Sequence, residues 1–143
     1  TGLARRCKVG ETRVASAEEL TRLHDGRYRE RLEKFAAMGG GWIESDTFVS
    51  PKSYDVACRA VGTCQAAVDA VMKGPEKTAL CLVRPPGHHA LTHDAMGFCL
   101  FNNVALAADR AVKQHKLERV LVIDWDVHHG NGTQDIFYER DDV

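Results

Sequence analysis

Residues 120–134 read VLVIDWDVHHGNGTQ, an apolar run that changes abruptly into acidic and imidazole side chains. β-Branched residues and leucine at 120–123 are typical of a buried strand. A second short apolar run, ALCLV at 79–83, ends in the same way in RPPGHH at 84–89. Because a long helical pattern separates the two runs, the sequence predicts βαβ units. The expected fold class is therefore α/β, with a buried parallel sheet flanked by helices.

Working outward from these runs, the apolar spacing and the capping residues predict helices over 16–24, 27–38, 54–73 and 98–116. Ser16 and Glu19 have the spacing of a capping box. Three glycines at 39–41 end the second helix, and Ser53 is expected to cap the third. Two strands are too few for a stable sheet, so the sequence indicates that part of the domain is missing from this chain.

Polar clusters follow both predicted strands at their carboxyl ends, where open α/β sheets bind ligands. An extended backbone would point Asp124, Asp126 and His128 to one side. A carboxylate and an imidazole two residues apart suit Zn²⁺ or another divalent first-row metal, so Asp126 and His128 are candidate ligands. Asp124 would then orient a neighbour through a hydrogen bond. The alternative is a strand-end turn with a capping aspartate and solvated histidines.

The histidine pair His88-His89 follows two prolines and a glycine. Adjacent side chains point in different directions, so the pair suits general acid–base work better than shared metal ligation. Ordinary surface histidines are the alternative. His24 and His115 fall on predicted helices and are expected to be solvated or capping residues, and His93 lies in a loop.

The composition is that of one globular domain: 143 residues, 19 basic and 20 acidic side chains, and a net charge of −1. This balance does not predict direct nucleic-acid binding, and there is no apolar run long enough for a membrane span. Five cysteines without a C-x-x-C pair indicate reduced thiols in an intracellular protein, cytoplasmic or nuclear. A start at Thr1 and an end at Val143 indicate a piece of a longer protein.

Three motifs together resemble the zinc-dependent histone deacetylase family, closest to its class II branch and the related bacterial acetyl-amide hydrolases. They are RPPGHHA at 84–90, GFCLFNN at 97–103 and DWDVHHGNGTQ at 124–134. Weaker likeness upstream extends the resemblance over 1–143. It implies an arginase/deacetylase-like fold, of which the chain would be the N-terminal portion of one catalytic domain, incomplete at both ends.

The resemblance also implies roles for individual residues. Asp126 and His128 would be zinc ligands, and His89 would be the general base and then the general acid. His88 would be its electrostatic partner, held by a hydrogen bond to Asp124. Asn131 would face His89, where the class I branch usually has aspartate.

The resemblance further places Gly97 and Phe98 along a narrow tunnel for the acyl-lysine side chain. Asp46 is a looser match to a residue that grips the substrate backbone. Structural K⁺ is expected near the backbone of 124–128, and Phe137 and Val143 resemble part of a second potassium site.

The implied reaction is hydrolysis of the acetyl amide of acetyl-lysine in histones or other proteins, with chromatin co-repressors as partners. Acetylpolyamines or other small acyl amides fit the same chemistry. The family's third metal ligand and its oxyanion donor lie further downstream than Val143, so the chain by itself is expected to be inactive.

Two alternative functions remain, a ureohydrolase and a non-catalytic scaffold. A two-manganese ureohydrolase needs an aspartate where this chain has Gly130, so a second metal would lose a ligand. A scaffold could bind acyl groups or partners without turnover.

Overall fold

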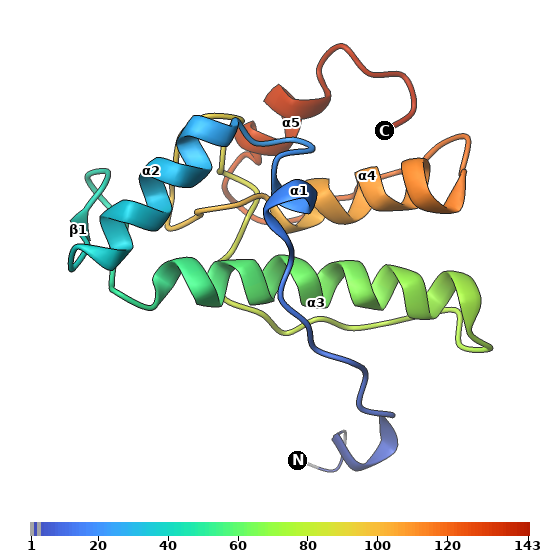
Figure 1. Ribbon diagram of the computed structural model, residues 1–143. Helices are drawn as coiled ribbons and strands as arrows, with labels where there is room; N and C mark the ends of the chain where they lie inside the picture. The colour runs from blue at the N-terminus through green and yellow to red at the C-terminus, as the bar shows by residue number, and fades with distance from the viewer. Residues whose placement is uncertain (1, 3) are drawn as a thin grey trace.

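The computed structural model describes residues 2 and 4–143; Thr1 and Leu3 lie outside the described part. Its elements, in chain order, are η1 (Ala4–Arg6), α1 (Ala17–Leu20), α2 (Gly26–Ala37), β1 (Gly41–Trp42), β2 (Phe48–Val49), α3 (Ser53–Lys73), α4 (Asn103–His115) and α5 (Asn131–Phe137). Helices α3 and α4 lie side by side, and α2 packs against α3 (Figure 1). Among the described residues, every helix is too short or too polar to cross a membrane.

The N-terminal helices begin at well-defined caps. The Ser16 hydroxyl accepts from the Glu19 backbone N–H at 3.1 Å, and the Glu19 carboxylate accepts from the Ser16 N–H at 2.8 Å. The predicted capping box is therefore confirmed, although α1 ends at Leu20 rather than at residue 24. At the start of α2, the Asp25 carboxylate accepts from two backbone N–H groups, so this helix begins one residue earlier than predicted.

Two predicted helix starts are wrong. Ser53 is the first residue of α3 rather than its cap, and its hydroxyl accepts from the Ser50 N–H at 2.9 Å. Helix α4 begins at Asn103, five residues later than predicted, because the Asn102 side chain accepts from the Ala105 N–H and caps it. Phe98 has φ of +65°, a left-handed conformation that a right-handed helix excludes.

Within the described residues, hydrogen-bonded strands occur only in the antiparallel hairpin β1–β2, where Gly41 pairs with Val49 and Trp42 with Phe48. The runs at 79–83 and 120–123 lack the predicted parallel pairing: no neighbouring strand within the described part supplies their hydrogen bonds. The second run keeps the alternation of a strand. Val120 and Val122 pack on α4 and α5, whereas Leu121 and Ile123 are exposed.

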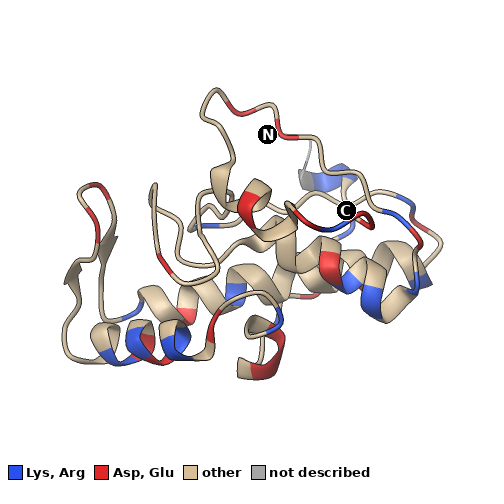
Figure 2. Cartoon of the chain, turned by 90° about the horizontal axis from the view of Figure 1, so that it is seen from above, with Lys and Arg blue, Asp and Glu red and all other residues tan. Residues whose placement is uncertain are grey.

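The main hydrophobic core lies between α1, α2, α3 and the segment that leads into α4. Its largest fully buried apolar side chains are Leu20, Tyr28, Leu32, Phe101 and Leu106. Phe101 lies directly before the cap of α4, so the core fixes the end of the loop that carries the histidine pair. Figure 2 shows acidic and basic residues interspersed on the same helices.

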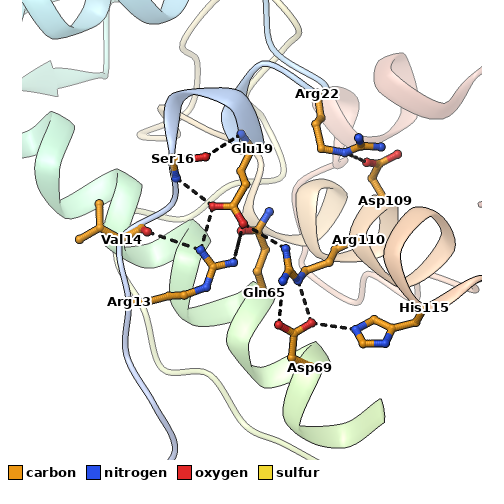
Figure 3. A network of polar contacts seen from close by, with 10 residues as sticks. All are labelled: Arg13, Val14, Ser16, Glu19, Arg22, Gln65, Asp69, Asp109, Arg110 and His115. Atoms are coloured by element: carbon orange, nitrogen blue, oxygen red, sulfur yellow. Dashed lines mark hydrogen bonds and ion pairs between the residues drawn. The ribbon is translucent and has the colours of Figure 1, made fainter. Parts of the chain in front are cut away.

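A network of ion pairs joins the N-terminal segment to α3 and α4 (Figure 3). The Arg110 guanidinium donates to both Asp69 oxygens, at 2.8 and 2.7 Å, and to Glu19 at 3.0 Å. Arg13 donates to the same Glu19 carboxylate at 2.7 and 2.8 Å, and His115 lies 2.7 Å from Asp69. The Arg110 hydrogen bonds hold the pKa of Asp69 well below its usual range.

Replacing Arg110 by methionine should lower the free energy of unfolding by about 2–3 kcal/mol, since it removes both guanidinium hydrogen bonds of the partly buried Asp69 and one of the two arginine partners of Glu19. Urea denaturation measures the change. The matched control is Lys113→Met on the same helix, whose ion pair with Asp142 is 3.2 Å long and whose side chain is 47% exposed. That change should cost less than about 1 kcal/mol. Equal losses for the two variants would contradict the stabilising role of the network.

Candidate active site

The two polar loops predicted from the sequence meet at the start of α5. The backbone N–H groups of Gly132 and Thr133 donate to the His88 carbonyl oxygen at 2.9 and 3.1 Å. A Cβ atom on Gly132 would lie 2.3 Å from the Ala90 oxygen, so only glycine permits this close approach. The loop at 84–102 and the loop at 124–130 are thereby joined, although 36 residues separate His88 from Asp124.

The structure brings His88 and Asp124 together. His88 Nδ1 lies 2.8 Å from Asp124 Oδ2, and the other carboxylate oxygen accepts from the Asp126 N–H at 3.1 Å. The hydrogen bond from His88 lowers the pKa of Asp124, so this group is a carboxylate near neutral pH. An ionised carboxylate only accepts, which places the proton on Nδ1 of His88 and leaves its Nε2 free.

The structure also brings His89 and Asn131 together. His89 Nδ1 lies 2.6 Å from the amide oxygen of Asn131, while the amide nitrogen of Asn131 points at Met96 Sδ, 3.4 Å away. With the amide oriented in this way, His89 donates from Nδ1 and keeps a lone pair on Nε2. The two imidazole rings lie side by side, with centroids 4.1 Å apart. The contact with Met96 was not predicted, and no spacing in the sequence signals it.

Asp126 and His128 face each other beside this pair. Asp126 Oδ1 lies 3.0 Å from His128 Nδ1, and the His128 ring centroid is 6.1 Å from that of His89. The hydrogen bond from the His128 N–H lowers the pKa of Asp126 and keeps it ionised. A carboxylate oxygen and an imidazole nitrogen that converge in this way fit a divalent ion such as Zn²⁺. They supply two donors; the described residues contain no cluster of three or more such side chains.

Two of the three predicted substrate residues lie around a cavity of about 540 Å³. Asp46 and Phe98 both line it, with aromatic side chains of the β1–β2 hairpin. Thr47 joins them: its hydroxyl accepts from the Phe98 N–H at 2.9 Å and donates to Asp46 at 2.8 Å. Thr47 is buried and was missed from the sequence, because its partner lies 51 residues away.

Gly97 contacts the His89 ring. It has φ of +55°, and a Cβ atom would lie 2.3 Å from His89 Cδ2. Replacing Gly97 by alanine should cost about 1–2 kcal/mol of stability from the backbone conformation alone, and should also displace the imidazole. Thermal unfolding and the ring resonances of His89 check the two effects. Gly39→Ala, at φ of +111° with open space around it, is the control that adds backbone strain without the clash. An unmoved His89 resonance in Gly97→Ala would contradict the close contact.

The remaining predicted histidines differ in their surroundings. His93 is exposed in its loop, and His115 is bonded to Asp69 in the ion-pair network rather than solvated. The prediction for His24 is wrong: it is 2% exposed and forms neither a solvated surface group nor a helix cap. Phe137, the candidate for a second potassium site, lies in a small apolar cluster against which Val143 packs.

Comparison with known proteins assigns the chain to part of a deacetylase domain. The family model of the histone deacetylase domain matches residues 1–143, and the chain belongs to this family. It is 48% identical to the histone deacetylase-like amidohydrolase of Pseudomonas aeruginosa, over all of this chain and 38% of that protein. It is 40% identical to human polyamine deacetylase HDAC10, over 99% of this chain and 22% of that protein.

Structural comparison supports the same conclusion. The crystal structure of the HDA15 HD domain superimposes with a TM-score of 0.92 at 38% identity, covering 97% of this chain and 39% of that one. The predicted arginase/deacetylase-like fold class is thus confirmed for the portion present. The chain spans less than half the length of these relatives.

Proposed function

We propose that the chain carries the acid–base residues of a zinc-dependent deacetylase that hydrolyses the acetyl amide of acetyl-lysine in histones or other proteins. The observation that supports this best is a pair of equivalent hydrogen bonds. Nδ1 of His88 lies 2.8 Å from a side-chain oxygen of Asp124, and Nδ1 of His89 lies 2.6 Å from that of Asn131. Each Nε2 is then free to exchange a proton. Asp126 and His128 lie directly beside them.

In the proposed mechanism, Asp126 and His128 would hold Zn²⁺, which when bound would polarise the amide carbonyl and lower the pKa of a water molecule. His89 Nε2 takes the proton of the attacking water and later returns it to the departing amine. His88, paired with the Asp124 carboxylate, stabilises the positive charge that forms on its neighbour. Gly97 and Phe98 would line the passage for the acyl-lysine chain, and Asp46 would hold the substrate backbone.

Catalysis should need more than the described residues supply. Two protein donors bind zinc weakly compared with the three of a catalytic site, and the oxyanion of the intermediate needs a further donor. The relatives extend well beyond the matched region. We therefore expect the 143-residue chain by itself to be inactive. Structural K⁺ near the backbone of 124–128, acetylated protein partners and co-repressor partners belong to the same proposal, as does a cytoplasmic or nuclear location.

The test compares the 143-residue chain with a protein that carries it inside a complete deacetylase domain. Both are assayed on an acetyl-lysine peptide, with and without a zinc chelator. Turnover by the complete domain that the chelator abolishes and zinc restores is the expected result. Chelator-insensitive turnover would refute zinc dependence. Turnover by the chain alone would refute the incompleteness of its site. No turnover on any acyl amide would favour the scaffold reading.

A second substrate class deserves a parallel assay, because relatives at about 40% identity include proteins named polyamine deacetylases. An acetylpolyamine presents the same acetyl amide on a flexible cationic chain. Higher kcat/KM on acetylspermidine than on the acetyl-lysine peptide would assign the protein to this class. The ureohydrolase hypothesis is disfavoured because Gly130 has no side chain that could bind a second metal ion.

A further inference from the structure

His24 is a buried histidine outside the site described above, with both ring nitrogens engaged. Nδ1 lies 2.9 Å from the Leu91 carbonyl oxygen, and Nε2 accepts from the Asn102 backbone N–H at 3.0 Å. A carbonyl only accepts and an N–H only donates, so the ring is neutral with its proton on Nδ1. Phe101 packs against the ring edge at a centroid distance of 5.2 Å. The orientation and the tautomer of His24 are therefore both determined by its surroundings.

These two hydrogen bonds connect the two ends of the segment 91–102, which lies in the loop that carries the active-site residues. Leu91 and Asn102 stand on either side of Gly97 and Phe98, and the segment between them contains no helix. The start of α2 adds two bonds to the same loop. The Asp25 N–H donates to the Thr92 oxygen at 2.7 Å, and the Tyr28 hydroxyl donates to the Leu100 oxygen at 2.6 Å. The His24 side chain is hydrogen-bonded to both ends of the loop.

Both partners of the His89–Asn131 hydrogen bond are connected to His24. Leu91 lies two residues after His89 in the chain. Asn102 donates through its side-chain amide to the Thr133 hydroxyl at 3.1 Å, and Thr133 lies in the first turn of α5, which begins at Asn131. One bond of His24 thus restrains the backbone of His89, and the other restrains the helix that presents Asn131.

We infer that His24 is a positioning residue that sets the His89–Asn131 hydrogen bond and, through it, the tautomer of His89. Its catalytic consequence rests on the proposed deacetylase function, but the geometric effect does not. Without the two bonds of His24, Leu91 and Asn102 lose their common partner, while the Gly132 and Thr133 N–H groups still bond the His88 oxygen and hold the loop to α5. The amide oxygen of Asn131 then favours the Nδ1-protonated form of His89 less strongly.

The experiment is long-range ¹H–¹⁵N correlation of the imidazole nitrogens in ¹⁵N-labelled protein. In the wild type, His89 should show a protonated Nδ1 and an unprotonated Nε2. The tautomer ratio of His89 is the population of the Nδ1-protonated form divided by that of the Nε2-protonated form. In His24→Phe, which keeps an aromatic ring but removes both bonds, this ratio should fall about fivefold, as for the loss of one ordinary hydrogen bond. His24→Asn and His24→Gln, which place an amide near Nδ1 and near Nε2 respectively, should each restore part of the ratio.

His115→Phe is the matched control, since it removes a partly buried histidine and its bond to Asp69 in a different part of the molecule. It should leave the His89 ratio unchanged. An unchanged ratio in folded His24→Phe, or an equal change in His115→Phe, would overturn the inference. If His24→Phe does not fold, His24→Asn and His24→Gln provide the test. A His89 tautomer ratio equal to that of the wild type in both variants would also overturn the inference.

Kinetics in an active complete domain separate the inference from the proposed function. His24→Gln should lower kcat with little change in KM, since the substrate does not touch His24. A protein without deacetylase activity whose His89 ratio still responds to His24 would refute the function and leave the positioning role intact. An active protein with normal kcat in all three His24 variants would refute the positioning role alone.

Discussion

Replacing His89 by alanine should lower kcat for acetyl-lysine hydrolysis by about 100- to 10,000-fold in a complete deacetylase domain, with KM changed little. The free Nε2 of His89 is the group proposed to take the proton from water and return it to the leaving amine. Its Nδ1 is committed to Asn131 at 2.6 Å, so the free nitrogen is held in one orientation. Steady-state kinetics on an acetyl-lysine peptide measure the two constants separately.

The matched control for this prediction is His129→Ala. His129 is exposed, and its Nε2 lies 2.7 Å from the Gln134 side-chain oxygen rather than beside the histidine pair. Losing it should leave kcat within about twofold of the wild type, as for a surface substitution. A His89→Ala protein that retained kcat within tenfold, or a His129→Ala protein that lost as much as His89→Ala, would refute the assignment of the general base.

His24 should make the protein less stable as the pH falls from about 6.5 towards 4. Burial lowers the pKa of His24 from 6.5 to about 4, so in this range the unfolded chain binds a proton that the folded protein does not. The stabilising contribution of neutral His24 to the free energy of unfolding is complete above pH 6.5. It decreases as the pH falls from 6.5 towards 4. The total change is about 3 kcal/mol. Protonation would also set an Nε2–H donor against the Asn102 N–H.

Urea denaturation between pH 7.5 and 4.5 measures this dependence. His24→Gln cannot bind the proton, so its free energy of unfolding should vary much less with pH over the window. His93→Gln, which removes an exposed histidine, should retain the wild-type slope. Glu19 and Asp69, whose pKa values are lowered by their arginine partners, contribute at more acidic pH. A slope in His24→Gln equal to that of the wild type would show that His24 is not the titrating group.

Local features of the chain were predictable where they depend on neighbours in sequence. The Ser16–Glu19 box closes within one helical turn, and the two-residue spacing of Asp126 and His128 already brings their side chains to one place. The start of α4 was not predictable in this way. The apolar residues from Phe98 onward have the spacing of a helix. However, Gly97 contacts the His89 ring, and residues 97 and 98 both have a left-handed backbone.

By itself, the sequence determined which chemical groups the site contains, because they are concentrated in two short motifs after apolar runs. Tertiary structure alone decided how these groups are used. The anchors of His88 and His89 come from partners 36 and 42 residues away, and the Nε2 partner of His24 comes from 78 residues away. A hydrogen bond acts only over about 3 Å, so its partners are defined once the fold has brought distant segments together. For the same reason, a histidine expected at the surface became a buried link between the loop and α4.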